Sequence, residues 1–498
     1  MRSDPWLRRC FFWSSLAIFI LGVSVELTDQ EAYYWTWSTQ PALGYYEHPP
    51  LQAWLTHFFC MILGDHTWVV RLPAFLGRIA SFWLLGSWAR KRWGDEVAAL
   101  AQWLLLGSFF FNAGSFISLP DSVMLPFAIA AMKFTDEHKP FKSGLMLGLA
   151  GLGKWTSALL APAVVLGFLL EKERSWGSRI ARAAAAGFTA FILQIPVLIW
   201  NQQNEWASFV FHLKERHEHG TLRPLQYLAN LGSFVGAQVL LGGVAFVIAA
   251  FFAWKPWREN RIWRSTTPGT PLWAWIVPTF FVFGSSAMQG ESRFYWTTVA
   301  YPAICVVLAL PLARLFPLEK MRFRKAQSWG LAVSLSLVAF ILWFPIGAYL
   351  KPLTDTYKPY DLRVSPRGDL TGWEQWVEED LRPQGLINDE VAFLATDFRL
   401  SSQIAWTARI HDMSRVGTVN HQSQFHFWKR PHPSRFHTVV FFGDNRRSPG
   451  PIFGNYCGHP LTWSKKDILL RGEKVKEIDW TVCRDFRWDA IHTASWRY

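Results

Sequence analysis

Residues 29–50 read Asp29-Gln-Glu-Ala-Tyr-Tyr-Trp-Thr-Trp37 and then, after a short gap, Gly44-Tyr-Tyr-Glu-His-Pro-Pro50. Together with Glu26, this stretch holds four acids and no Lys or Arg. Carboxylates beside aromatic rings at a membrane surface can act as bases, and Tyr and Trp rings can stack on sugars. An aromatic belt with solvated acids is the simpler alternative. Composition alone leaves both interpretations open.

The chain on both sides of this stretch consists of long apolar segments. Hydrophobic residues make up 51% of the 498 residues, with 30 Trp and 40 Phe. A hydrocarbon core of about 30 Å takes roughly 20 residues to cross. We therefore predict an α-helical multi-pass membrane protein of about eleven transmembrane helices. The predicted spans are roughly 10–27, 67–89, 96–116, 120–135, 143–155, 156–171, 181–200, 226–253, 271–286, 295–313 and 328–349.

Segment 10–27 has two interpretations. It follows Arg8 and Arg9, as the apolar part of a signal peptide would. No small-residue cleavage site precedes Asp29, however, and further spans follow. We interpret the segment as a retained first helix.

Basic residues set the predicted orientation. Lys and Arg gather in alternate loops, as in 90–92, 133–142, 172–182 and 255–264, whereas residues 28–64 contain none. This asymmetry places the N-terminus in the cytoplasm and accounts for the net charge of +13 without a nucleic-acid partner. An odd number of spans puts residues 351–498 outside. For a bacterial inner membrane, that is the periplasm.

Residues 351–498 differ from residues 1–350 in being polar and interrupted by Pro and Gly. Two apolar runs that end in Asp, Val391–Asp397 and Thr438–Asp444, read as buried strands, and a helix to Arg409 follows the first. We predict a transmembrane domain over 1–350 and a soluble α/β domain over 351–498. Cys457 and Cys483 could pair there in an oxidising compartment.

The stretch of residues 29–50 resembles bacterial members of the membrane-embedded glycosyltransferases with the GT-C fold. That group includes the aminoarabinose transferase of lipid A and the protein O-mannosyltransferases (glycosyltransferase family 39/83-like). The group's Asp-Glu-Ala-Tyr-Tyr-Trp is matched by Glu31–Trp35, and its Gly-Tyr-(Tyr/Phe)-(Asp/Glu)-(His/Lys)-Pro-Pro by Gly44–Pro50. Gln30 departs from the pattern, because the group has an Asp there and Gln cannot be a base. Asp29 or Glu31 takes that role, or the activity is altered or lost.

Further motifs resemble the same group over nearly the whole chain. Asp121 matches the group's second outer acid, with a helix N-cap as the alternative role. Lys154 lies in an apolar span, and no acid lies near it in the sequence. A charge in such a span is costly, so Lys154 is expected to have a functional role by default. The other matching stretches are Pro196–Asn201, Asn204–Phe209, Glu291–Pro302, Leu370–Trp373 and Gln424–Trp428.

The resemblance implies an inverting transfer of a sugar from a polyprenyl (undecaprenyl) phosphate to a lipid, glycan or protein acceptor on the outer face of the membrane. The departing phosphate needs cations, and the acceptor hydroxyl needs a base. A divalent cation is conceivable beside the acids, but with Lys and Arg present we predict no metal cofactor. The predicted bases are Asp29, Glu31 and Asp121; the predicted phosphate-binding residues are His48, Lys154 and Arg293; the predicted substrate-binding residues are Tyr33, Tyr34, Trp35, Tyr45, Tyr46, Glu47 and Glu291.

Two other functional classes compete with the enzyme. A secondary transporter would use Lys154 and the outer acids differently, but such proteins often carry inverted repeats and none is visible. A catalytically inactive scaffold for polysaccharide assembly is the second alternative, motivated by Gln30. Turnover of a lipid-linked sugar separates the enzyme from both.

Overall fold

The computed structural model describes residues 4–213, 224–260, 269–289, 294–315, 370–418, 423–428, 435–444, 456–470 and 473–487, with a few positions between 328 and 336. The chain divides into two compact units. The first comprises Met1–Gly22, Leu43–Leu55 and Arg71–Val338, and the second comprises Val23–Ala42, Thr56–Val70 and Ala339–Tyr498. Each unit is described by itself. The predicted domain boundary at residue 350 falls outside the described residues and stays a prediction.

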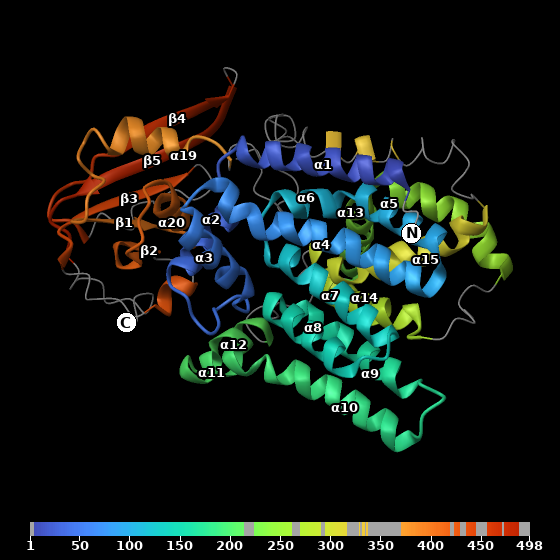
Figure 1. The fold of residues 1–498 in the computed structure, drawn as a ribbon. Coiled ribbons are helices and arrows are strands. Elements are labelled where there is room, and N and C mark those ends of the chain that lie inside the picture. Colours follow the sequence, from blue (N-terminus) through green and yellow to red (C-terminus); the bar gives the residue numbers. More distant parts are fainter. Residues whose placement is uncertain are drawn as a thin grey trace. The chain divides into compact units, whose positions relative to one another are not determined.

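The first unit is helical (Figure 1). Its helices, some of which begin or end outside it, are α1 (Pro5–Val23), α4 (Thr67–Trp93), α5 (Asp95–Gly107), α6 (Phe109–Phe116), α7 (Pro120–Asp136), α8 (Pro140–Gly153), α9 (Ala161–Leu169), α10 (Trp176–Ile192), α11 (Ile195–Gln203), α12 (Ala207–Leu213), α13 (Pro224–Asn260), α14 (Leu272–Met288) and α15 (Tyr301–Leu315). Two 3-10 helices, η1 (Trp155–Leu160) and η4 (Phe294–Ala300), connect them. Helix α3 (Leu51–Leu63) begins in this unit and continues into the second.

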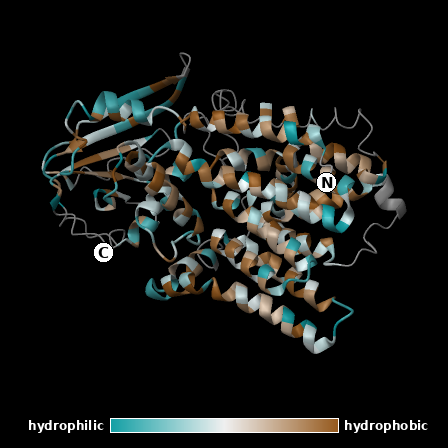
Figure 2. Ribbon diagram, viewed as in Figure 1, coloured by the Kyte–Doolittle hydropathy of each residue, from teal (hydrophilic) through white to brown (hydrophobic). Residues whose placement is uncertain are grey.

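Four of the described helices are long and apolar enough to cross a membrane, or up to six spans if each bent pair counts as one. The bent pairs are α5 with α6, at 61°, and α10 with α11, at 46°. Figure 2 shows the apolar residues spread over these helices. All the predicted spans except 328–349, which lies almost wholly outside the described residues, coincide with helices or helix pairs. Several are shorter than a full crossing, so the total of eleven stays a prediction.

Glycines allow two pairs of helices in this unit to approach very closely. A Cβ atom at Gly77 of α4 would collide with the backbone carbonyl of Ser122 in α7. A Cβ atom at Gly144 of α8 would collide with the carbonyl of Ala186 in α10. Small residues at such crossings are typical of helices that pack within a membrane. The Gly77 contact also fixes the start of α7 against α4.

The second unit contains a five-stranded sheet in the order β2-β1-β3-β5-β4. Strands β2, β1 and β3 are parallel, and β5 pairs antiparallel with both β3 and β4. The first run of residues predicted as strand and helix is confirmed as β1 followed by α20, and the second as β3. The elements are β1 (Val391–Ala395), β2 (Val416–Thr418), β3 (Thr438–Asp444), β4 (Ser464–Leu470), β5 (Glu473–Cys483), α2 (Asp29–Thr39), α19 (Trp373–Trp376), a π-helical turn (Val377–Leu381) and α20 (Phe398–Thr407).

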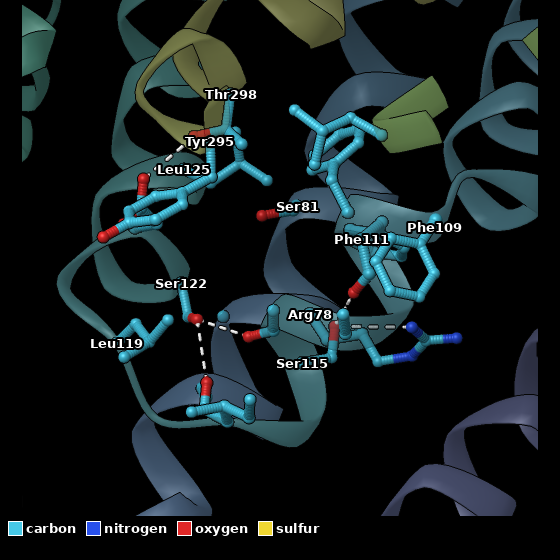
Figure 3. Close-up of a pocket in the computed structure, with 18 residues that line it drawn as sticks. Arg78, Ser81, Phe109, Phe111, Ser115, Leu119, Ser122, Leu125, Tyr295 and Thr298 are labelled. Carbon is cyan, nitrogen blue, oxygen red and sulfur yellow. Dashed lines mark hydrogen bonds between the residues drawn. The ribbon is translucent and has the colours of Figure 1, made fainter. Parts of the chain in front are cut away.

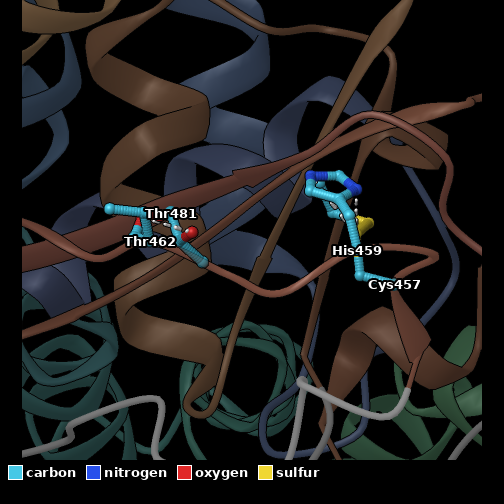
Figure 4. Close-up of a disulfide and its surroundings, with 5 residues drawn as sticks. Cys457, His459, Thr462 and Thr481 are labelled. Atoms are coloured by element: carbon cyan, nitrogen blue, oxygen red, sulfur yellow. Dashed lines mark hydrogen bonds between the residues drawn. A yellow bond between two sulfur atoms is a disulfide. The ribbon is translucent and has the colours of Figure 1, made fainter.

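A disulfide bond joins Cys457 to Cys483 in this unit (Figure 4). Cys483 is the last residue of β5, and Cys457 forms an isolated bridge with Phe486. Both cysteines pack in an apolar cluster with Phe441 and Phe486. The pairing that the sequence left open is therefore confirmed.

Candidate active site

The first unit places Lys154 beside Asp121. Lys154 follows the last residue of α8 in an extended conformation, and its side chain is almost completely buried. Its Nζ donates a hydrogen bond of 2.6 Å to Asp121 Oδ2, and Thr298 Oγ1 donates one of 2.9 Å to Asp121 Oδ1. No acid lies near Lys154 in the sequence, and the fold supplies one from 33 positions away.

The N-cap role considered for Asp121 was wrong. Leu119 is the N-cap of α7, and Asp121 lies in the first turn with its carboxylate directed to Lys154 and Thr298. The Lys154 ammonium also lies 5.0 Å from the centre of the Tyr295 ring, within the range of a cation–π contact. Sequence reasoning missed Thr298 and Tyr295 as site residues. Both lie inside the matching stretch Glu291–Pro302, which also contains Arg293, and that stretch was the available signal.

The stretch Gly44–Pro50 packs against α12. The Tyr46 ring lies 4.7 Å from that of Phe211, and His212 Nε2 lies 2.7 Å from the backbone oxygen of Glu47. The His48 ring is 6.4 Å from the His212 ring. Tyr45 and Tyr46 are both buried, so the structure gives these rings packing contacts, and their role in binding sugar stays a prediction. His212 was not predicted as a site residue.

Residues 154 and 155 connect the Lys154–Asp121 contact to the contacts between Gly44–Pro50 and α12. Lys154 contacts Asp121, while the next residue, Trp155, packs against Phe209 and His212 at ring distances of 5.3 and 6.3 Å. The same break between α8 and η1 thus holds the ion pair on one side and the α12 contacts on the other. This arrangement brings together the predicted Asp121, Lys154 and His48 regions within one unit.

Asp121 also lines a cavity of about 260 Å³ (Figure 3). Tyr295 and Thr298 of η4 form one part of its wall, and α4 and α6 form another. The wall is mostly apolar and aromatic, with a few hydroxyl groups. A buried ion pair beside such a cavity could orient a polar substrate in surroundings that exclude water.

In the second unit, Thr28 and Glu31 form a capping box at the start of α2. Glu31 Oε2 accepts hydrogen bonds from the Thr28 backbone N–H, at 3.0 Å, and from its hydroxyl, at 3.1 Å. Glu31 is completely buried, whereas Asp29 is half-buried in the first turn. Gln30 accepts a long hydrogen bond from the Tyr34 hydroxyl. The box gives Glu31 a structural role that sequence reasoning missed, although Thr-x-x-Glu is its known signature.

Two aromatic residues predicted to bind substrate form part of the core of this unit. The Tyr33 hydroxyl accepts a 2.8 Å hydrogen bond from the Gln424 backbone, and its ring packs against Phe398. Trp35 Nε1 donates to Asp65 Oδ1 at 2.8 Å, and its ring packs against Trp406. Tyr34 is also buried. These contacts explain why rings are needed here; contact with sugar stays a prediction.

Glu26 connects the start of the first loop to α19. Its two carboxylate oxygens accept hydrogen bonds from the backbone N–H groups of Gly372, at 2.9 Å, and Trp373, at 3.0 Å. Burial, followed by the charge of Glu26, raises the pKa of the nearby Glu374. The two stretches of residues 351–498 singled out from the sequence, around Gly372 and Gln424, therefore both contact the segment 23–42.

The structure describes the predicted residues in two groups. Asp29, Glu31 and Tyr33–Trp35 belong to the second unit, and Tyr45–His48, Asp121 and Lys154 belong to the first. Glu291 and Arg293 lie outside the described residues.

Comparisons with known proteins give three findings. Residues 47–200 match the family described as dolichyl-phosphate-mannose-protein mannosyltransferase. The lipid A galacturonosyltransferase RgtD of Rhizobium johnstonii is 25% identical over 311 residues, which cover 57% of this chain and 61% of RgtD. The crystal structure of ArnT from Cupriavidus metallidurans, apo or bound to undecaprenyl phosphate, superimposes with a TM-score of 0.64. ArnT is 13% identical in the apo structure and 14% in the bound one, and the matches cover 96% and 97% of this chain and 97% and 98% of ArnT.

These findings confirm the resemblance to GT-C membrane glycosyltransferases that the loop motif indicated. The chain has the fold of ArnT and is a multi-pass membrane protein. The match to residues 47–200 includes His48, Asp121 and Lys154. The chain spans about three fifths of the curated relative it matches.

Proposed function

We propose, from the ArnT fold and the buried Lys154–Asp121 pair, that this protein is an inverting glycosyltransferase. It moves a sugar from a polyprenyl phosphate to an acceptor hydroxyl. The observation that carries the proposal is the ion pair at the wall of an apolar cavity, within the segment that matches a glycosyltransferase family. A solved structure of the same fold with undecaprenyl phosphate bound supports the class of donor.

The cations would stabilise the leaving group. When the bond between the sugar and phosphate breaks, negative charge grows on the phosphate, and positive groups fixed in advance lower that barrier. Lys154, His48 and Arg293 are the proposed groups. Asp121 would hold the Lys154 ammonium in one position, because its other carboxylate oxygen is fixed by Thr298. Asp121 is therefore better suited to orient Lys154 than to take a proton.

The proposed base is Asp29. Attack on the anomeric carbon from the side opposite the phosphate needs a carboxylate that takes the acceptor's proton. Glu31 already accepts two hydrogen bonds from Thr28, whereas Asp29 is half-buried. The carboxylate one position upstream would thus replace the acid that Gln30 lacks. Direct displacement by the acceptor inverts the anomeric configuration.

We propose that the protein lies in a bacterial inner membrane and crosses it eleven times. Its N-terminus would lie in the cytoplasm and its C-terminal domain in the periplasm. The basic loops support this orientation. The Cys457–Cys483 disulfide supports it independently, because such bonds persist in oxidising compartments. Labelling of an introduced cysteine in residues 351–498 by a membrane-impermeant reagent in intact spheroplasts would test it. Protection until the membrane is permeabilised would contradict it.

A lipid acceptor is favoured over a glycan or a protein, because RgtD is described as acting on lipid A. The experiment supplies purified protein with a panel of polyprenyl phosphate sugars and with lipid A, and measures free polyprenyl phosphate and glycosylated lipid. Nucleotide sugars serve as negative controls. Turnover of one lipid-linked sugar is expected. A folded protein that uses none of the panel would favour the inactive scaffold.

A further inference from the structure

Four lysines gather where α7 turns into α8. These two helices lie side by side (Figure 1), with the turn 137–139 between them. Three ammonium groups surround the Phe134 ring at 5.4, 5.7 and 5.9 Å from its centre, and they belong to Lys133, Lys139 and Lys142. Lys91, in the last turn of α4, joins them by contacting Glu137. We call these four residues the lysine cluster.

Glu137 is the acid that the lysine cluster shares. Its carboxylate lies 2.5 Å from Lys139 Nζ, 3.1 Å from Lys91 Nζ and 3.7 Å from Lys133 Nζ. Among the residues that the structure describes, no other acid contacts the cluster, and the exposed Lys142 forms no ion pair. Four lysines beside one carboxylate leave three positive charges uncompensated, and like charges that lie close together repel one another.

The two buried acids beside the lysine cluster do not supply the missing negative charge. Asp136, the last residue of α7, contacts the Arg92 guanidinium at 2.6 Å. Glu171 contacts Arg174 at 3.0 Å and Arg182 at 2.8 Å. Both carboxylates are therefore occupied by arginines, and the excess of positive charge stays with the lysines.

An exposed apolar strip begins beside the lysine cluster. Phe141 and Leu145 lie one turn apart on α8 and are 67% and 40% exposed. Residues four positions apart share one face of a helix, so the strip runs along α8 away from the cluster. In a helical unit that crosses a membrane, such a face contacts lipid chains. A cluster of cations at the head of an apolar strip is complementary to an anionic headgroup with a chain attached.

We propose that the lysine cluster binds the headgroup of an anionic phospholipid, and that one of its acyl chains lies along Phe141 and Leu145. Basic clusters at the ends of membrane helices attract anionic lipids. The three uncompensated charges favour an anionic headgroup over a zwitterionic one, because a zwitterionic headgroup brings a cation of its own. The apolar strip favours a lipid over free phosphate, which has no chain to place there. In the orientation proposed above, this lipid belongs to the cytoplasmic leaflet.

The bound lipid would stabilise the helix pair that carries the candidate active site. Asp121 lies in the first turn of α7, and Lys154 follows the last residue of α8, so both lie at the end of the pair opposite the lysine cluster. A ligand that binds only the folded state raises its stability. Anionic phospholipid should therefore raise the unfolding temperature, and this expectation does not depend on the proposed transferase function.

Lipid binding to the purified, delipidated full chain in a nonionic detergent tests the proposal. The probes are phosphatidylglycerol, phosphatidylcholine with the same acyl chains, and inorganic phosphate. Native mass spectrometry measures the affinity for each lipid, and thermal unfolding measures the stabilisation by each probe. Wild-type protein should bind phosphatidylglycerol more tightly than phosphatidylcholine, and only phosphatidylglycerol should raise its unfolding temperature.

The variant Lys139→Gln/Lys142→Gln removes two lysines of the cluster. It should weaken phosphatidylglycerol binding roughly 10- to 25-fold, about fivefold for each lysine, and change phosphatidylcholine binding less than about twofold. Lys172→Gln is the matched control, because Lys172 is also exposed, lies in the turn before α10 and is not part of the cluster. That control should bind phosphatidylglycerol as wild type does. Without anionic lipid, all of these variants should unfold close to the wild-type temperature.

Three results would overturn the proposal. Equal wild-type affinity for the two lipids would show that the lysine cluster is an ordinary solvated surface. Equal stabilisation by inorganic phosphate and phosphatidylglycerol would assign the cluster to a free anion. Equal weakening by Lys172→Gln and the double variant would show a general attraction of this end to anionic lipid. Should the double variant fail to fold, Lys142→Gln replaces it with about a fivefold expected loss, and unchanged phosphatidylglycerol affinity would again refute the site.

Discussion

Lys154 donates a 2.6 Å hydrogen bond to Asp121 across 33 residues of sequence. The bond joins the end of α8 to the first turn of α7, and Lys154 is 3% exposed. A buried pair of this kind is weak evidence for stability, because desolvation of two charges offsets much of their attraction. Its position beside a cavity therefore points to a functional role, and the contributions of the pair to stability and to function can be separated by mutation.

Mutations of the Lys154–Asp121 pair should affect stability and turnover differently. Lys154→Met leaves Asp121 with a buried, uncompensated charge and should lower stability by roughly 3 kcal/mol. The Lys154→Met/Asp121→Asn double variant removes both charges and should regain most of that loss. Both variants should lose about 10²–10³-fold in turnover, because neither has the cation for the phosphate. Thermal unfolding in detergent and donor turnover measure the two effects.

One result would contradict the assignment of Lys154 to the donor phosphate. If the double variant regains turnover along with stability, the pair is structural and Lys154 does not act on the donor. Lys142→Met, which removes a lysine at the other end of α8, is the control and should change neither quantity.

Asp29 and Glu31 can be separated because Gln also serves at the third position of a capping box. Glu31→Gln should retain the fold of α2 and most of the turnover. Asp29→Asn should retain the fold and lose roughly 10²–10⁴-fold in turnover, the range for removal of a general base. The ratio of the two rates with one donor is the measurement. Wild-type rates in both variants would remove this loop from the chemistry.

The elements that the sequence predicted best are those whose pattern has one physical cause. Long apolar runs such as 67–89 can only be buried in a membrane or a core, and they are helices. The strand Val391–Ala395 and the helix after it follow from a short apolar run closed by Asp397, which caps α20 through the Arg399 N–H. Lys154 was singled out because a lone charge is expensive in such a segment.

The parts that were missed depend on contacts distant in sequence. No local pattern near Lys154 identifies Asp121 as its partner or Thr298 as the second donor to Asp121. Arg78 lies in the middle of the predicted span 67–89 but was not singled out, and its partners Ser14 and Asn112 are distant in sequence. Helix α3 was read as loop because 13 apolar residues are too few to cross a membrane. Segment 23–42 likewise packs with residues 370–487 through contacts of Glu26, and no local sequence pattern predicts these contacts.

Glu26 should stabilise the second unit through its two backbone hydrogen bonds. An ionised acceptor is worth about 1.5–3 kcal/mol per bond. With two such bonds, Glu26→Ala should lower stability by roughly 3–6 kcal/mol and release the start of α19, because the N–H groups of Gly372 and Trp373 would lose their acceptors. Hydrogen exchange at Gly372 and Trp373 reports this directly. Glu378→Ala, an exposed partner of Arg382, is the control, and equal exchange in the two variants would contradict the assigned role.

The lowered pKa of Glu477 predicts how the stability of the second unit changes with pH. Hydrogen bonds from Lys474 and Lys465 lower the pKa of its carboxyl to about 2. The folded pKa lies below the ordinary value near 4.5, so this group adds stability above that value and loses it as the pH falls toward 2. Its side chain is 19% exposed and solvent screens the contacts. Glu477→Gln should thus lower the unfolding midpoint slightly at pH 7 and not at pH 2. Equal differences at both pH values would show that the lysines stabilise β4 and β5 without this carboxylate.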